Sequence, residues 1–178
     1  GTVINAPAAV FLAMHIVLAE KQGADLTRIR GNLQNDTLKE FTARGNFIFP
    51  VEPSIKLVGD TIEYCAAHAP KYSPVSVCGY HIRESGANPA QEMAYAFCIA
   101  RAYADDVIRR GLPVDEFAGR LSFNFNCFGS LFEQVAKFRA GRGLWAKIMK
   151  EQYGATQPGS MWLRMIAGGG GGGLTFEQ

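Results

Sequence analysis

The sequence predicts an α/β fold in which about five parallel strands alternate with helices. Strand-like segments recur roughly every 30 to 45 residues, with a helical segment between each pair, as in right-handed βαβ units. A complete (β/α)8 barrel needs about 250 residues, and the chain has 178. We therefore expect a partial (β/α)8 TIM barrel. A doubly wound open sheet is the alternative, although no glycine-rich phosphate motif follows the first strand.

Five short segments carry the composition of strands. We expect strands at residues 2–5, 28–33, 76–79, 120–125 and 160–167. In the fourth segment Phe123 and Phe125 alternate with Ser122 and Asn124, a period of two that predicts one apolar and one polar face.

Apolar residues at helical spacing predict helices at residues 7–23, 36–41, 54–69, 88–110 and 130–154. The fourth helix has the clearest start, because Asn88 can cap it, Pro89 suits its first position and Gln91 completes a capping box. Ser130 and Glu133 predict a second capping box at the start of the last helix.

Composition indicates an ordinary globular protein, with 48% hydrophobic residues, 19% charged residues and a net charge of +2. No basic run indicates nucleic-acid binding, and no apolar run of about 20 residues indicates a membrane span. The four cysteines form no Cys-x-x-Cys pair, so we expect no metal site. Without a signal peptide, a cytoplasmic location is expected. The chain begins without methionine inside a strand-like run, and we expect it to be part of a longer protein.

The stretch at residues 76–86 changes from apolar to polar within three positions. It reads as a buried strand, then a polar turn carrying Tyr80 and His81, then the helix that begins at Asn88. An α/β enzyme presents its chemistry at the carboxyl end of a strand in this way. A strand end that happens to hold a histidine explains the pattern equally well.

The other predicted strand ends also hold neutral hydrogen-bonding groups. They are Asn5, then Asn32 and Gln34, then Tyr80 and His81, then Ser122 and Asn124, then the glycines that begin at Gly168. In a barrel these positions converge on one mouth. Such a mouth can position a polar substrate and polarise a carbonyl, but it has no evident group for hydrolysis. Harder chemistry would have to come from a cofactor.

Several motifs together resemble the coenzyme B12-dependent acyl-CoA mutases of the methylmalonyl-CoA mutase family. They lie at residues 30–36, 38–40, 43–45, 79–81, 120–123 and 139–142. The resemblance runs over essentially the whole chain. It implies that residues 1–178 form the central part of an acyl-CoA-binding TIM barrel, with the start of the barrel and the cobalamin-binding domain outside the chain.

The resemblance also implies the chemistry. In this family the CoA chain passes through the barrel axis and adenosylcobalamin lies across the mouth. The cofactor supplies a radical that abstracts a substrate hydrogen, and the acyl-thioester group then migrates to the neighbouring carbon. A dimer or a partner subunit is expected for the full-length protein, and the chain alone is expected to be inactive.

Individual site residues follow from the resemblance. His81 matches a histidine that polarises the thioester carbonyl, and Tyr80 matches a tyrosine lying against the cofactor. Gln34 and Asn32 match positions near the substrate thioester, although methylmalonyl enzymes usually have threonine in place of Asn32.

Three further residues are assigned in the same way. Arg44 matches the arginine that pairs with the free carboxylate of the substrate, and Arg120 and Ser122 match residues that line the CoA path. Arg44 could instead be a cation at the end of a helix.

The chain departs from the methylmalonyl branch after its last strand. Ile166 and Gly168 replace a histidine and a glutamine, and Gly169 and Gly170 replace a threonine and a serine. A roomier, less polar pocket resembles the ethylmalonyl-CoA mutase branch, so ethylmalonyl-CoA to methylsuccinyl-CoA is the expected reaction. The alternatives are methylmalonyl-CoA to succinyl-CoA, or a non-catalytic barrel that binds CoA esters. The glycine run could also be a flexible linker.

Overall fold

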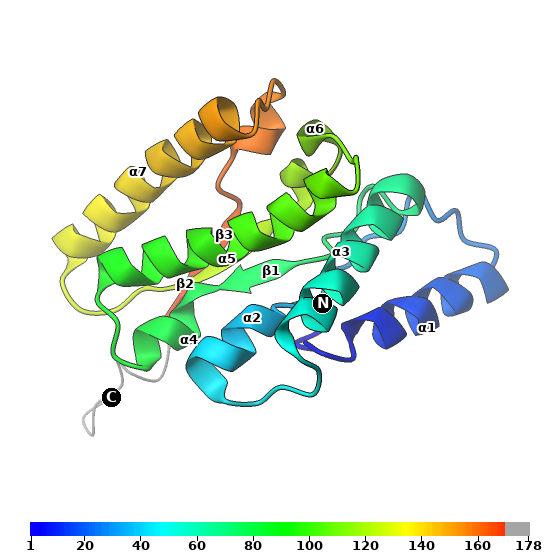
Figure 1. Ribbon diagram of the computed structural model, residues 1–178, viewed down its shortest axis with the longest axis horizontal. Helices are drawn as coiled ribbons and strands as arrows, with labels where there is room; N and C mark the ends of the chain where they lie inside the picture. The colour runs from blue at the N-terminus through cyan, green and yellow to red at the C-terminus, as the bar shows by residue number, and fades with distance from the viewer. Residues whose placement is uncertain (170–178) are drawn as a thin grey trace.

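The computed structural model describes residues 1–169 and contains a three-stranded parallel sheet in the order β1–β2–β3 (Figure 1). The strands are β1 (Ser76–Cys78), β2 (Ser122–Asn126) and β3 (Met165–Gly168). Each pair of neighbours is parallel, and helices separate the strands in sequence. The α/β class is therefore confirmed, with three strands in the described part of the chain rather than the expected five.

The two N-terminal strands were predicted wrongly, because their segments form only single parallel bridges, Thr2 with Leu33 and Asn32 with Ser73. Backbone hydrogen bonds still join the segments, from Thr2 N to Asn32 O at 3.0 Å and from Leu33 N to Ser73 O at 3.1 Å. Asn35, with a φ of 47°, turns the chain out of the extended conformation directly after this pairing. The described segments do not close into a barrel.

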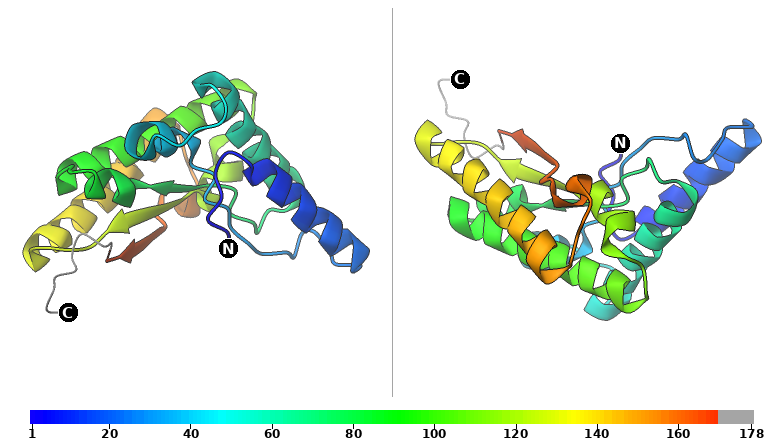
Figure 2. Two further views of the ribbon diagram at one scale, coloured as in Figure 1. Left: turned by 90° about the horizontal axis from the view of Figure 1, so that it is seen from below. Right: turned by 90° about the horizontal axis from the view of Figure 1, so that it is seen from above.

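The described part of the chain has four long helices: α1 (Ala8–Lys21), α3 (Val51–His68), α5 (Pro89–Arg109) and α7 (Leu131–Lys147). Helices α5 and α7 pack on one face of the sheet, while α1 lies against α3 at the far end (Figure 2). None of the helices in the described part of the chain is long and apolar enough to cross a membrane.

Short helical turns connect these elements. They are α2 (Thr37–Lys39), the π-helical turn η1 (Glu40–Arg44), α4 (Gly79–Glu84), α6 (Val114–Phe117), and the turns η2 (Ala118–Arg120), η3 (Ile148–Gln152) and η4 (Pro158–Met161). The polar turn predicted after the strand at 76–79 is therefore a helix, α4, and the strand predicted from residue 160 begins only at Met165.

The helix starts were predicted with mixed success. The capping box at Asn88 is confirmed, because its side chain accepts from Gln91 N at 2.9 Å while the Gln91 side chain accepts from Asn88 N at 3.0 Å. The box at Ser130 is wrong, because the Ser130 side chain makes no capping bond. Instead Gln134 Nε2 donates to Phe128 O at 2.8 Å and ties the preceding loop to the helix.

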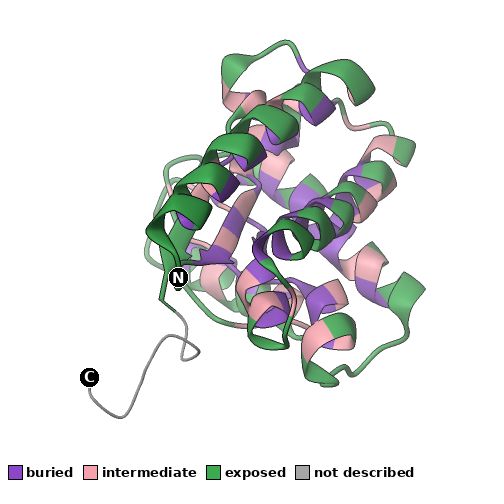
Figure 3. Ribbon diagram, turned by 90° about the vertical axis from the view of Figure 1, so that its left-hand side faces the viewer, coloured by how far each residue is buried: buried purple, intermediate pink, exposed green. Residues whose placement is uncertain are grey.

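The main core lies between the sheet and helices α5 and α7. The ring centroids of Phe123 and Trp145 are 4.9 Å apart, and those of Phe97 and Phe123 are 5.6 Å apart. Ser122 and Asn124 alternate with these buried rings and are half-buried, which confirms the period of two in this strand. Buried residues line the inner helix faces and the outer faces stay exposed (Figure 3).

Candidate functional site

Tyr80 and His81 lie at the carboxyl end of β1, on the first turn of α4. Their ring centroids are 3.7 Å apart and the ring planes differ by 34°. Gly79 makes the change from strand to helix possible, since a Cβ there would lie 2.9 Å from the Phe125 ring and 3.1 Å from the Glu92 side chain. A side chain at residue 79 would therefore require the Phe125 ring to move.

The His81 imidazole is held in its neutral form. His81 is only 8% exposed, and its Nδ1 is buried without a hydrogen-bond partner among the described residues. Burial, helped by the nearby positive charges of Lys39 and Arg44, lowers the pKa of His81 to about 3. A neutral imidazole keeps one N–H group, which can donate to a carbonyl oxygen.

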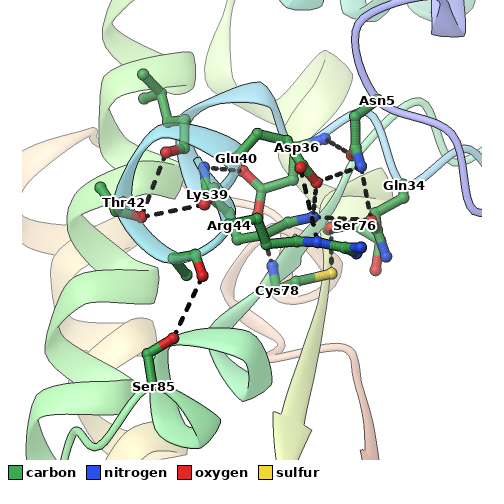
Figure 4. A network of polar contacts seen from close by, with 12 residues as sticks. Asn5, Gln34, Asp36, Lys39, Glu40, Thr42, Arg44, Ser76, Cys78 and Ser85 are labelled. Carbon is green, nitrogen blue, oxygen red and sulfur yellow. Dashed lines mark hydrogen bonds and ion pairs between the residues drawn. The ribbon is translucent and has the colours of Figure 1, made fainter. Parts of the chain in front are cut away.

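A network of buried polar groups lies beside α4 (Figure 4). Asp36 is fully buried, and its carboxylate accepts from Cys78 N at 2.7 Å and from the Tyr103 hydroxyl at 2.8 Å. Burial raises the pKa of Asp36, although these hydrogen bonds and the Lys39 charge oppose the rise. Asp36 thereby ties the end of β1 to α2 and α5.

Lys39 is the centre of this network and is 0% exposed. Its Nζ donates to Gln34 Oε1 at 3.0 Å and forms an ion pair with Glu40 Oε1. Asn5 Nδ2 donates to both acceptors, at 3.0 Å to Gln34 Oε1 and at 2.6 Å to Glu40 Oε1. No site role was predicted for Lys39 or Glu40, although residues 38–40 are one of the motifs that carry the family resemblance.

Gln34 and Asn32 are two residues apart on one extended segment, so their side chains share a face. Gln34 is 6% exposed and belongs to the network, whereas Asn32 is half-buried. Gln34 O accepts from Ser76 N at 2.9 Å, which holds this segment beside β1. Gln34 therefore lies beside the start of the strand that precedes His81.

Arg44 ends the turn η1, and its side chain is 45% exposed. Its Nε lies 3.8 Å from Glu40 Oε2. A cleft of about 320 Å³ opens beside Arg44, and its wall is formed by residues 3–7, Glu40, Arg44, Asn46 and Ile48. The guanidinium therefore reaches solvent beside the buried network, and it lies close enough to His81 to lower the pKa of the imidazole.

Arg120 and Ser122 lie where β2 begins, not where it ends. Ser122 Oγ donates to Val75 O at 3.1 Å, and Arg120 ends the turn η2 just before the strand. Burial lowers the pKa of Arg120, and the nearby positive charges of Arg164 and Arg30 add to this effect. The expectation that Ser122 lies at the carboxyl end of its strand is wrong, and the structure separates these two residues from His81 along the strand direction.

Asn126 occupies the strand end that was assigned to Ser122. It is fully buried at the carboxyl end of β2, where its N donates to Glu92 Oε1 at 2.7 Å and its O accepts from Lys137 Nζ at 2.5 Å. Lys137 and Glu92 form a second buried ion pair, at 2.9 Å. The predicted strand ended at Phe125, so sequence reasoning missed this position by one residue.

Gly168 ends β3, level with Asn126. A Cβ added at Gly168 or at Gly169 would meet nothing within 4 Å, and Ile166 on the same strand is 63% exposed. Side chains at these positions would therefore project into open space. The predictions for Gly170 and the three glycines after it lie outside the described residues.

Comparison with known proteins gives a consistent result. Residues 2–178 match the family described as methylmalonyl-CoA mutase. The chain is 47% identical to the 2-hydroxyisobutanoyl-CoA mutase large subunit of Aquincola tertiaricarbonis over 161 residues, which are 90% of this chain and 29% of that protein. It is 44% identical to a methylmalonyl-CoA mutase of Cereibacter sphaeroides over 161 residues, 90% of this chain and 23% of that protein.

An ethylmalonyl-CoA mutase of Cereibacter sphaeroides is 40% identical over 154 residues, which are 85% of this chain and 24% of that protein. These relatives are all acyl-CoA mutases by name. The chain belongs to the methylmalonyl-CoA mutase family. It spans between 23% and 29% of the length of these three relatives, whose names differ in the acyl group.

Proposed function

We propose that the chain supplies the substrate-binding part of an adenosylcobalamin-dependent mutase that rearranges a dicarboxylic acyl-CoA. Ethylmalonyl-CoA to methylsuccinyl-CoA is the first candidate, and methylmalonyl-CoA to succinyl-CoA is the alternative. The observation that carries the proposal is the solvent-reachable guanidinium of Arg44 in a cleft beside the neutral imidazole of His81.

Arg44 would bind the free carboxylate of the acyl group. Guanidinium and carboxylate form bidentate, charge-assisted pairs, and only Nε of Arg44 is near the Glu40 carboxylate. The Nη groups of Arg44 are engaged by no ion pair with a described residue, so they can receive the substrate.

His81 would donate a hydrogen bond to the thioester carbonyl, and Gln34 and Asn32 would line the same region. A neutral donor suits this task, because it stabilises charge that shifts onto the carbonyl oxygen without giving up a proton. Arg120 and Ser122, at the opposite end of the sheet, would line the path of the CoA chain in a (β/α)8 barrel.

The carboxyl edge of the sheet fits a large planar cofactor in two respects. Tyr80 offers a half-buried aromatic ring in tilted contact with His81, and backbone without side chains continues from Gly168 to Gly169. Adenosylcobalamin, when bound, would supply the radical that abstracts the substrate hydrogen. Tyr80 would pack against it and exclude water from the reacting group. We further propose that the full-length protein forms a dimer or binds a partner subunit, and that it is cytoplasmic.

A monocarboxylic substrate is the second candidate function, because one relative is named for 2-hydroxyisobutanoyl-CoA. Such a substrate has no free carboxylate for Arg44 to bind. The two candidates therefore differ in the consequence of removing one charge.

The test uses the complete protein, meaning this chain with the sequence that flanks it in its gene. Turnover of ethylmalonyl-, methylmalonyl- and 2-hydroxyisobutanoyl-CoA is measured with adenosylcobalamin for the wild type, Arg44→Gln and the control Arg109→Gln, an exposed arginine at the end of α5. The free carboxylate of the substrate would lose its charge-assisted partner, so Arg44→Gln should depress kcat/KM for the dicarboxylic thioesters only.

Three results would contradict the proposal. Unchanged discrimination in Arg44→Gln would make Arg44 a cation at a helix end. A wild type that turns over only 2-hydroxyisobutanoyl-CoA would select the second candidate. Binding of the thioesters without any turnover would indicate a non-catalytic CoA-ester barrel.

A further inference from the structure

The orientation of the Gln34 carboxamide is fixed by its neighbours. Two groups lie 3.0 Å from the same side-chain atom, Lys39 Nζ and Asn5 Nδ2. An ammonium group can only donate a hydrogen bond, so the atom facing Lys39 must be the carbonyl oxygen Oε1 and not the amide nitrogen. Figure 4 shows both contacts reaching Gln34 from the network side.

The orientation of Asn5 is fixed in turn. Its Oδ1 accepts from Asp36 N at 3.0 Å, and a backbone N–H can only donate. Its Nδ2 therefore faces the other way, toward Gln34 and the Glu40 carboxylate. In each hydrogen bond between the Asp36 backbone and Gln34 Oε1, the donor and the acceptor are therefore fixed.

Both acceptor positions of Gln34 Oε1 are thereby occupied by the protein. Its Nε2, on the other branch of the planar carboxamide, donates to none of the described residues. We propose that Lys39 and Asn5 are positioning residues that fix the orientation of the Gln34 carboxamide. In this orientation the Gln34 Nε2 group can donate a hydrogen bond to an acceptor oxygen of the acyl group. This inference rests on the proposed function, in which Gln34 lies near the thioester.

Lys39 also acts on the carboxylate side of the site. Glu40 Oε1 is held by Lys39 and Asn5, which leaves Glu40 Oε2 to face Arg44 Nε at 3.8 Å. The ammonium at the centre thus fixes the amide donor of Gln34 and, through Glu40, one side of the Arg44 guanidinium. Both groups then offer N–H donors, a set that matches carbonyl and carboxylate oxygens and not hydroxyl hydrogens.

Gln34→Glu tests the orientation with one changed atom. A carboxylate at residue 34 still accepts from Lys39 and Asn5. It adds a second negative charge beside Glu40, and the donor becomes an acceptor that repels substrate oxygens. We expect kcat/KM for the best of the three thioesters to fall by roughly 5- to 150-fold, the range for loss of a buried hydrogen bond. An unchanged kcat/KM in a folded Gln34→Glu protein would overturn the assigned orientation.

A double-mutant cycle between Lys39→Met and Gln34→Ala tests the action of Lys39. Residues that act through each other are non-additive, so Lys39→Met should lower kcat/KM at least about 5-fold more in the wild type than in the Gln34→Ala background. Lys137→Met, which breaks the other buried Lys–Glu pair, is the control. Lys137→Met should lower kcat/KM by the same factor in the wild type and in the Gln34→Ala background, as a substitution with a purely structural effect does.

Lys39→Met leaves Glu40 without its buried partner and could prevent folding. The same cycle with Lys39→Met and Glu40→Gln combined removes both charges and keeps an acceptor for Asn5. Equal factors in both backgrounds, with Gln34→Ala itself impaired, would overturn the role of Lys39 and leave the proposed function standing. Normal activity of Gln34→Ala would overturn the substrate contact of Gln34, and no turnover of any thioester would overturn the proposed function and this inference together.

Discussion

Lowering the pH should loosen α4, because His81 must stay neutral while it is buried. The imidazole has an ordinary pKa of 6.5 when exposed and a pKa of about 3 in the folded protein. Between these values the opened form binds a proton that the folded form excludes. The stability of α4 should therefore be unaffected above pH 7, fall as the pH drops through 6.5, and stop falling below about pH 3.

The size of the effect follows from the two values. At pH 5 the exposed imidazole is about 1.5 pH units below its pKa while the folded one remains neutral, which corresponds to about 2 kcal/mol. The equilibrium for opening α4 should then rise roughly 30-fold between pH 7 and pH 5. This effect applies to local opening, so it can be measured within the complete protein.

Hydrogen–deuterium exchange of the α4 amides, corrected for the intrinsic pH dependence, measures this opening. His81→Gln keeps an amide donor and cannot titrate, so its opening should not show the 30-fold rise. His68→Gln, which changes an exposed histidine at the end of α3, should follow the wild type. Equal pH dependence in the wild type and in His81→Gln would refute the reasoning.

Three further outcomes are expected. His81→Ala should lower kcat by about 10²–10³, the effect of losing one donor worth about 2.7–4 kcal/mol in the transition state, and a raised KM with unchanged kcat would make His81 a binding residue only. Asp115 accepts from Thr156 N at 3.0 Å, and hydrogen bonds from residues including Thr156 lower its pKa to about 2. The stabilisation of the folded protein by the Asp115 carboxylate should be present above pH 3.8 and lost as the pH falls through 2. Asp115→Asn should therefore lower the melting temperature at pH 7 but not at pH 1.5. Equal melting temperatures of wild type and variant at pH 7 would contradict this. Ile166→His with Gly168→Gln should shift the ratio of kcat/KM from ethylmalonyl- toward methylmalonyl-CoA by about 10- to 200-fold, since the added side chain at 168 meets open space, and an unaltered ratio would remove the glycines from the pocket wall.

Local signals in the sequence predicted local structure well. The Asn88 capping box needs only residues within one turn, and both of its hydrogen bonds are present. The alternation around Phe123 needs only the period of a strand, and its rings do face the helices. The Ser130 box is absent although its spacing is correct, and Gln134 instead connects the helix to the preceding loop.

The parts that the sequence could not predict depend on contacts between distant residues. The segments at 2–5 and 28–33 are extended and adjacent, but a ladder also needs continuous pairing, which the turn at Asn35 interrupts. Lys39 looks like a solvated helix residue until Asn5 and Gln34, 34 and 5 residues away, close around it. The burial of the Lys39 charge therefore depends on contacts with distant residues and cannot be predicted from the neighbouring sequence.

Each of the two buried ion pairs holds the end of an extended segment. Lys39 holds the segment that carries Gln34, and Lys137 holds Asn126 at the end of β2, so each ammonium binds the end of an extended segment. Burying such pairs brings little net stability, but separating either partner leaves a charge without compensation, which costs about 3–5 kcal/mol. Any shift of these segment ends would break a pair. The segment end that carries Gln34 and the carboxyl end of β2 are therefore each held by a buried ion pair. Such support suits a site built from neutral hydrogen-bond donors, since these donors act only at short range and in the correct direction.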